Sequence, residues 1–164
     1  MYFTNNLEQD CLNLFLYIDA LPLFTTSNRA KYNNGKRPIS NLYGTTNFGI
    51  IANKSKVIKE RVKNPEGQEI FEEFVKLHYG DFKFNQVIIN RDFKITKHID
   101  AKNVGESIII GLGDYQEGKL VVEFENEIKK IDIKNKFYKF DGSKYYHFVE
   151  QFKGNRYSLV FYNQ

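Results

Sequence analysis

The chain has 164 residues, of which 41% are apolar and 27% charged, and its formal net charge at pH 7 is +4. This composition is that of one globular domain large enough to bury its own core, and the single cysteine, Cys11, excludes a disulfide framework. There is no signal-peptide pattern and no apolar run long enough to cross a bilayer, so we expect an intracellular protein without membrane contact, cytoplasmic or in a viral, phage or nuclear setting.

A helix is predicted near the N-terminus, over residues 7–21. Apolar side chains recur there at helical spacing, at Leu7, Cys11, Leu14, Phe15 and Ile18. Asn5 and Glu8 form a capping box at the start of this helix, and Pro22 ends it.

The segment after this helix is polar, basic and rich in glycine. Residues 24–49 show no sustained period, which predicts a long loop of the kind that is usually functional or mobile in a compact domain. A short strand is predicted at residues 48–52. After Pro65, a second helix is predicted with one broad apolar face, made by Ile70, Phe71, Phe74, Val75 and Leu77.

Beyond Gly80 the pattern changes to short strands separated by turn-forming Asn, Asp and Gly residues. Eight strands are predicted, at residues 84–90, 94–100, 106–113, 119–125, 129–133, 137–141, 145–150 and 156–162. Such a series after a helical segment is typical of a jelly roll. We therefore predict one α+β, mainly β domain over residues 1–164. Its core, residues 81–164, is a double-stranded β-helix of the cupin kind, and the helices of residues 1–80 pack on one sheet.

Two of the three histidines stand where paired strands could bring them together. His98 and Asp100 are two residues apart at the end of a predicted strand, so their side chains share one face. His147 lies on the seventh predicted strand, which in a jelly roll returns beside the second. Two imidazoles and one carboxylate leave positions open on a metal ion, as in non-haem Fe(II) sites. Singly, a chance His–Asp pair and a half-buried, aromatic-like His147 explain the same residues without a metal.

The last predicted strand carries a candidate anion site. Arg156 begins this strand, nine residues after His147, and Ser158 faces the same way two residues later. A guanidinium can donate two parallel charge-assisted hydrogen bonds to a carboxylate, and a neighbouring hydroxyl can add a third. An Arg156 that only makes an ion pair on a surface strand is the alternative.

The order of these motifs resembles that of the Fe(II)/2-oxoglutarate-dependent dioxygenase superfamily. The resemblance covers roughly residues 84–164. Within the superfamily, "HIDAKNVGESIIIGLGDYQEGKLVVE" and "FDGSKYYHFVEQFKGNRYSLVFY" are similar to the TET and base-J-binding-protein branch, whose members oxidise the methyl group of 5-methylpyrimidines. Unlike most members of that branch, the chain is short and contains no cysteine-rich zinc insert.

The resemblance implies a set of ligands and cofactors. Fe(II) would be held by His98, Asp100 and His147, and 2-oxoglutarate by Arg156 and Ser158. Dioxygen would be the second cosubstrate, and ascorbate could support turnover. The implied reaction is oxidation of the methyl group of 5-methylcytosine or thymine in nucleic acid, with DNA favoured over RNA.

Further candidate residues surround this set. Asn90 could contact the cosubstrate or the substrate, or merely form a turn. Asn103 could reach the rim of the pocket and contact the substrate there, or merely shape the turn after Asp100. Between residues 20 and 59 the chain has seven Lys or Arg residues and no Asp or Glu. Arg29 and Arg37 in this stretch could contact phosphates, and Tyr43 could stack on a base. A solvated basic surface and core packing of Tyr43 are the alternatives.

Two other classes of function remain open at this stage. The same chemistry could hydroxylate a protein side chain or a small metabolite, and a jelly roll without activity could bind a ligand or a partner. The presence of five site residues in the expected order argues against a mere scaffold. We expect a monomer.

Overall fold

The computed structural model describes residues 3–20, 39–44, 62–63 and 65–164. Its elements are α1 (Leu7–Asp19), β1 (Ile39–Gly44), β2 (Val62–Lys63), α2 (Pro65–His78), β3 (Gln86–Arg91), β4 (Ser107–Leu112), β5 (Tyr115–Glu117), β6 (Leu120–Glu123), β7 (Ile128–Ile131), β8 (Tyr138–Phe140), β9 (Tyr146–Val149), β10 (Phe152–Gly154) and β11 (Tyr157–Tyr162). None of the helices in these described ranges is long and apolar enough to cross a membrane.

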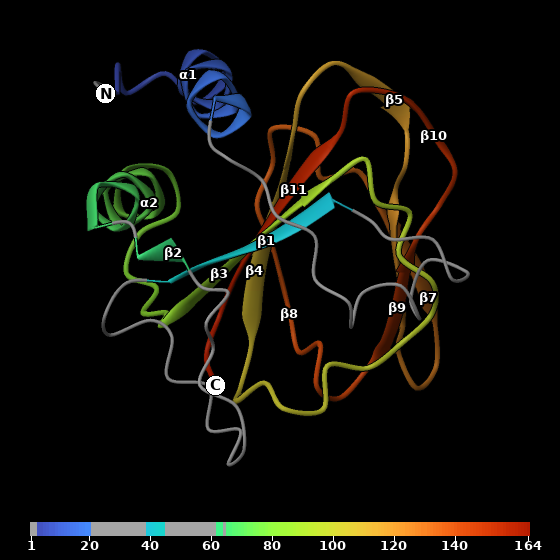
Figure 1. Cartoon of the computed structure of the whole chain (residues 1–164). Coiled ribbons are helices and arrows are strands. Elements are labelled where there is room, and N and C mark those ends of the chain that lie inside the picture. Colours follow the sequence, from blue (N-terminus) through green and yellow to red (C-terminus); the bar gives the residue numbers. More distant parts are fainter. Residues whose placement is uncertain (1–2, 21–38, 45–61, 64) are drawn as a thin grey trace.

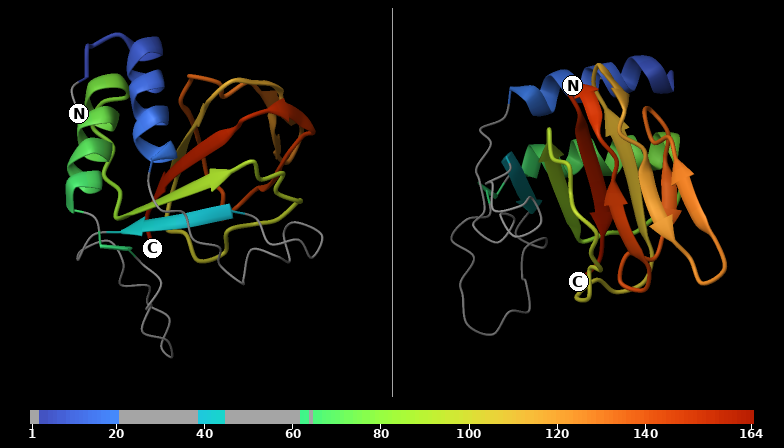
Figure 2. Two further views of the ribbon diagram at one scale, coloured as in Figure 1. Left: turned by 45° about the horizontal axis from the view of Figure 1, so that its top comes forward. Right: turned by 90° about the vertical axis from the view of Figure 1, so that its right-hand side faces the viewer.

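The strands form mostly antiparallel sheets. The largest has six strands in the order β2-β1-β3-β11-β4-β8, in which β1 and β2 run parallel to each other. A three-stranded sheet, β7-β6-β9, faces it, and β10 pairs with β5 in a two-stranded sheet. Both helices cover the face of the six-stranded sheet that points away from β7-β6-β9 (Figures 1 and 2). This arrangement confirms a mainly β fold with the helices on one sheet.

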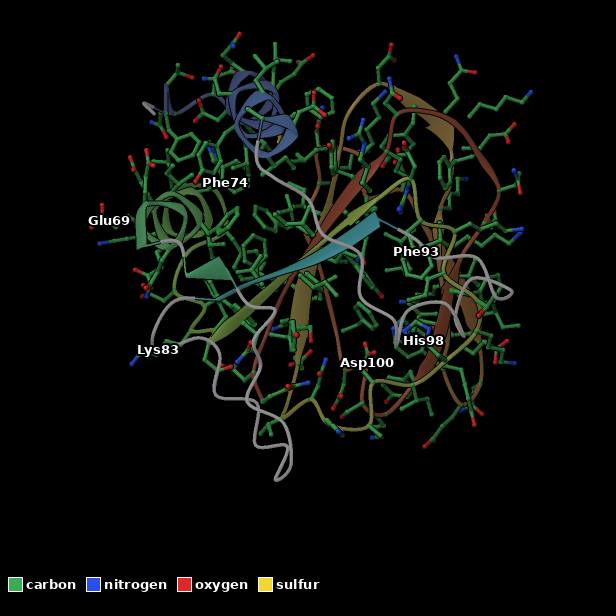
Figure 3. All side chains as sticks on the ribbon, viewed as in Figure 1. Glu69, Phe74, Lys83, Phe93, His98 and Asp100 are labelled. Atoms are coloured by element: carbon green, nitrogen blue, oxygen red, sulfur yellow. The ribbon has the colours of Figure 1, made fainter. Side chains whose placement is uncertain are left out.

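Alternation along the strands divides the interior into two parts. On β11, Tyr157, Leu159 and Phe161 pack against the helices. Ser158 and Val160 point the other way, because successive side chains of a strand face opposite sides. The helix side forms the larger apolar core, with α2 contributing Phe74 (Figure 3). The other side leaves a space between the sheets that holds the candidate site.

The helices agree with the prediction except at the two ends of α1. Asn6, and not Asn5, caps α1: its side chain accepts a hydrogen bond from the Gln9 N–H at 2.9 Å. Asn5 has a φ of 71° and lies before the cap, so the capping box predicted with Glu8 is wrong. The helix ends at Asp19, two residues before the predicted end.

A buried carboxylate joins the two helices. Asp10 of α1 accepts hydrogen bonds from the Thr4 N–H at 2.7 Å and the Thr4 hydroxyl at 2.8 Å, and His78 Nε2 of α2 lies 2.7 Å away. Burial by itself would raise the pKa of Asp10, but the hydrogen bonds from Thr4 and His78 outweigh it and lower this pKa below its usual value. Asp10 is therefore ionised at neutral pH.

Seven of the eight predicted core strands are confirmed, as β3, β4, β6, β7, β8, β9 and β11. The strand predicted at residues 94–100 is wrong: only His98 pairs there, in an isolated antiparallel bridge with His147. The bridge has two backbone hydrogen bonds, and a third, from the Val149 N–H to the Ile95 carbonyl, keeps the segment beside β9 without a regular ladder.

The structure also adds strands where none was predicted. β5 and β10 pair with each other across segments predicted as turns. β1 lies inside the predicted loop of residues 24–49 and pairs with β3, where Ser40 lies opposite Asn90. The strand predicted at residues 48–52 lies outside the described residues.

Candidate metal centre

The two histidines and the aspartate singled out in the sequence converge in one place. His98 Nε2 lies 3.3 Å from one carboxylate oxygen of Asp100, and His147 Nε2 lies 3.2 Å from the other. One donor atom from each residue lies within 4.8 Å of the others. His98 and Asp100 come from the segment after β3 and His147 from β9, so the His98–His147 bridge brings the group together. Figure 3 places His98 and Asp100 in the space between the two larger sheets.

Backbone carbonyls determine which imidazole nitrogen faces the centre. His98 Nδ1 lies 2.8 Å from the Thr96 carbonyl and His147 Nδ1 lies 2.9 Å from the Tyr145 carbonyl. A carbonyl oxygen only accepts, so each Nδ1 carries a proton and donates it. The Nε2 atom of each ring is therefore the one that faces Asp100. This is how metal-bound histidines are usually oriented.

The charge of Asp100 suits a cation. Burial by itself would raise its pKa, but hydrogen bonds from His147 and His98 hold this pKa well below its usual range. These bonds require a proton on an Nε2 atom when no metal is bound, and a divalent cation can take the place of that proton. Two imidazole nitrogens and a carboxylate are a suitable donor set for Fe(II).

Gly142 forms one wall of this centre. Its carbonyl accepts a hydrogen bond from the Asp100 N–H at 2.8 Å. A β-carbon at this position would stand 3.1 Å from Asp100 Oδ2 and 3.3 Å from His147 Cε1. The ring of Phe140 packs edge-on against His147, with centroids 5.0 Å apart. The absence of a side chain at Gly142 therefore leaves room beside the ligands.

A cavity of about 100 Å³ opens beside these ligands. Its lining is mostly apolar, with a few neutral polar groups and the charge of Asp100. The lining residues are Ile88, Asn90, Phe93, Ile95, His98, Asp100, Asn103, Ser107, Ile109, Leu120, Phe140, His147, Val149, Ser158, Val160, Tyr162 and Gln164. Six residues predicted from the sequence are among them.

Asn90 and Ser158 form a hydrogen-bonded polar pair in the lining of the cavity. They lie opposite each other on β3 and β11, and Asn90 Nδ2 donates a hydrogen bond to Ser158 Oγ at 3.2 Å. Because the Ser158 oxygen accepts this bond, its own hydroxyl proton can be donated to a ligand.

Arg156 faces the same side of β11 as Ser158 but is not one of the residues that line the cavity. Its side chain is 1% exposed and packs between the rings of Tyr115 and Phe152, at 5.3 and 5.7 Å. Its Nε and Nη2 atoms have no hydrogen-bond partner among the described residues. Burial lowers the pKa of the guanidinium, but an arginine stays charged in proteins. A buried cation with unused N–H groups is costly unless an anion binds it.

Tyr115 is a site residue that the sequence analysis missed. Its hydroxyl is buried and makes no hydrogen bond of standard geometry with a described residue, but it lies close enough to Arg156 to counter the effect of burial on the pKa of the guanidinium, and its ring packs on Arg156. The Gly-Asp-Tyr motif at residues 113–115 was visible in the sequence. Its position was not, because β5 was taken for a turn.

The structure describes only some of the residues that were predicted to contact the substrate. Asn103 lines the cavity, and its Oδ1 accepts a hydrogen bond from Gln164 Nε2 at 3.4 Å. Tyr43 lies on β1, with its backbone opposite Val87. Arg29, Arg37 and the side chain of Tyr43 lie outside what the structure describes, so their roles stay predictions.

Solved structures share this fold, whereas no family model and no curated protein matches the sequence. An oxidoreductase of the 2OG-Fe(II) oxygenase family from Burkholderia pseudomallei superposes over 92% of this chain and 76% of its own, with 17% identity and a TM-score of 0.61. A prolyl-4-hydroxylase from Pseudomonas putida matches over 98% of this chain and 88% of its own, with 10% identity and a TM-score of 0.54. NgTET1, in complex with 5mC DNA, matches over 85% of this chain and 66% of its own, with 12% identity and a TM-score of 0.50. At these identities the similarity shows a common fold, that of the 2OG-Fe(II) oxygenases.

Proposed function

We propose that the chain is an Fe(II)- and 2-oxoglutarate-dependent dioxygenase. The observation that carries this proposal is a metal-ligand triad, His98, Asp100 and His147, in the same interior as a buried guanidinium whose Nε and Nη2 atoms have no hydrogen-bond partner among the described residues. A metal centre alone would suit many hydrolases, and a buried arginine alone would suit many anion sites. Together they fit a cosubstrate that binds metal at one end and carries a carboxylate at the other.

We also propose that the two facing sheets form a double-stranded β-helix. The fold shared with 2OG-Fe(II) oxygenases supports this assignment. So does the segment of residues 94–100, which is joined to β9 by three backbone hydrogen bonds in the place of the second core strand.

Four polar residues of the interior have a role in binding the cosubstrate in this proposal. Bound Fe(II) would supply dioxygen activation coupled to oxidative decarboxylation of 2-oxoglutarate. Arg156 would donate its Nε and Nη2 protons to the distal carboxylate, and Ser158 and Tyr115 would add hydroxyl donors. Asn90 would orient Ser158 through their 3.2 Å hydrogen bond. The apolar side chains between these groups would exclude water, which strengthens every charged interaction in the site.

For the substrate we propose a 5-methylpyrimidine in nucleic acid, 5-methylcytosine or thymine, with DNA favoured. The quoted motifs around Asp100 and Arg156 support this choice, and so does the fold shared with NgTET1 in complex with 5mC DNA. A base cannot react inside its stack, so it would have to be flipped out or come from a single strand. Asn103 would then contact the base at the cavity. Arg29, Arg37 and Tyr43 would contact the backbone and neighbouring bases.

A hydroxylase of a protein side chain or a small metabolite is the second candidate. It is favoured by the match to the Pseudomonas putida prolyl-4-hydroxylase, which covers more of this chain than the match to NgTET1 does.

The product of turnover distinguishes the two candidates. Purified protein is incubated with Fe(II), 2-oxoglutarate, ascorbate and DNA that contains 5-methylcytosine, as single and as double strands. Digestion and mass analysis should find oxygen on the methyl group, with one succinate formed per oxidation. Succinate without an altered nucleoside would favour the second candidate. Absence of both products with every substrate class would contradict the dioxygenase itself.

The basic stretch is tested separately. Neutralising Arg29, Lys31, Lys36 and Arg37 together should weaken DNA binding and make the slope of log affinity against log salt shallower, by about 0.7–0.9 for each phosphate that is no longer neutralised. Neutralising the exposed Lys129, Lys136, Lys139 and Lys153 serves as the matched control. Equal effects of the two sets would show that only net charge matters.

A further inference from the structure

We propose that Ser107 is a specificity-determining residue whose hydroxyl binds the polar edge of the substrate base, at the end of the cavity opposite Arg156. This inference rests on the proposed function and adds a substrate contact to it.

The Ser107 hydroxyl does not stabilise the described part of the fold through any hydrogen bond. The residue is 1% exposed, and its Oγ has no hydrogen-bond partner within the described ranges. It begins β4, the strand "SIIIGL", in which every residue is buried. An unpaired buried hydroxyl is destabilising, so an alanine would suit the ligand-free fold better. Because Ser107 is one of the residues that line the cavity, a ligand bound there can pair with its hydroxyl.

The buried polar atoms without partners in the described chain fall into two groups at opposite ends of the site. One group is Arg156 Nε, Arg156 Nη2 and the Tyr115 hydroxyl. The other is Ser107 Oγ and Gln164 Oε1, both from residues of the cavity lining. One ligand at each end would satisfy both groups.

Strand register shows that one molecule of 2-oxoglutarate is too short to contact both Ser158 and Ser107. Ser158 lies opposite Gly111 of β4, and Ser107 lies four residues from Gly111 on the same face of that strand. Four residues of strand span about 13 Å. The two carboxyl carbons of 2-oxoglutarate are separated by four C–C bonds, or about 5 Å. A cosubstrate bound near Ser158 therefore leaves Ser107 to a second molecule.

Ser107 nevertheless lies close to the metal centre. It is paired in register with Phe140, whose ring packs against His147 with centroids 5.0 Å apart. A group held by Ser107 would thus lie near the reacting centre, as a substrate must.

The surroundings of Ser107 define the chemistry of that substrate. Asn103 and Gln164 add neutral amides to the lining, and among the described residues that line the cavity only Asp100, a proposed metal ligand, has a charged side chain. Within this described lining, a cationic amine or a free carboxylate would find no opposite charge beyond the metal centre. A saturated ring without a polar edge would leave the Ser107 hydroxyl unpaired. A pyrimidine, which is neutral and has donors and acceptors along one edge, fits these groups.

The test compares Ser107→Ala with wild type in steady-state turnover of an oligonucleotide that contains 5-methylcytosine. Loss of one hydrogen bond should raise KM for the oligonucleotide about tenfold. KM for 2-oxoglutarate should stay within about twofold, and more succinate should form per oxidised base. Thermal unfolding of the ligand-free protein should be unchanged or shifted upward. Ile108→Val, the neighbouring position on the helix side of β4, is the control and should lower the melting temperature without altering KM.

The outcomes separate this inference from the function on which it rests. An active wild type with an equally active Ser107→Ala variant, unchanged in KM and coupling, would overturn the role of Ser107 and leave the dioxygenase intact. A loss of 2-oxoglutarate affinity in Ser107→Ala would also overturn it, because the residue would then serve the cosubstrate. A wild type that neither binds nor oxidises this DNA would overturn both the nucleobase substrate and the role of Ser107.

Discussion

Replacing Arg156 with Met tests the cosubstrate site through two measurements. The affinity for 2-oxoglutarate should fall, and the stability of the ligand-free protein should stay the same or rise. The side chain is 1% exposed, and methionine fills much of its volume without charge. The backbone N–H of Arg156 donates to Asp92 Oδ1 at 2.8 Å, and this bond survives any change of side chain. The substitution therefore removes the guanidinium while the start of β11 keeps its anchor.

The expected magnitude follows from the two unpaired groups. Nε and Nη2 are both buried and have no partner in the described chain, so each can give one charge-assisted bond to a carboxylate. Such bonds contribute about 1.5–3 kcal/mol each, so the pair contributes roughly 3–6 kcal/mol. At about 1.4 kcal/mol per tenfold, Arg156→Met should weaken 2-oxoglutarate binding by about 100-fold or more. Arg156→Lys should recover only part of this, because an ammonium has no fork geometry.

The same substitution should not destabilise the ligand-free protein. It removes a buried charge whose Nε and Nη2 atoms have no hydrogen-bond partner among the described residues, and such replacements are often neutral or stabilising. Calorimetric titration of 2-oxoglutarate into protein loaded with Mn(II), an oxygen-stable substitute for Fe(II), measures the affinity. Thermal unfolding with and without 2-oxoglutarate measures the stability. Lys153→Met, which removes an exposed cation from β10, is the control and should change neither. Unchanged 2-oxoglutarate affinity with a lower melting temperature would refute the reasoning and make Arg156 a structural residue.

Three further substitutions test the metal centre and the helix pair. His147→Ala should abolish stoichiometric Fe(II) binding with little change in melting temperature, and retained binding would contradict the triad. Gly142→Ala puts a methyl group 3.1 Å from Asp100 Oδ2, so the metal affinity measured by chelator competition should fall about tenfold or more. An unchanged affinity would mean that the backbone around residue 142 shifts to accommodate the methyl group. Asp10→Asn breaks the buried pair with His78 and should lower the free energy of unfolding at pH 7 by at least about 2 kcal/mol. The pKa of Asp10 is lower in the folded protein than in the unfolded chain, where it is about 3.9. The ionised carboxylate therefore stabilises the fold fully above that unfolded pKa, and this stabilisation is lost as the pH falls through the folded pKa. The difference between Asp10→Asn and wild type in the free energy of unfolding, measured with denaturant, should thus shrink below about pH 4.

The sequence by itself determined the features that depend on short spacing. Helical periodicity predicted α1 and α2, because one face of each must be apolar to pack on a sheet. Alternation predicted most core strands. It also predicted that Ser158 shares its face with Arg156. These properties follow from backbone geometry over a few residues, which the local sequence encodes.

Contacts between distant strands could be decided only by the tertiary structure. His147 meets His98 through a single bridge, and the segment of residues 94–100 stays beside β9 without becoming a strand. The pairing of β5 with β10 brings Tyr115 to Arg156, although local turn chemistry predicted neither strand. Whether the hydroxyl of Ser107 finds a partner depends on which side chains arrive from other strands. The physical reason is that register and burial are chosen by packing over the whole domain, where local preferences contribute only a small part of the free energy.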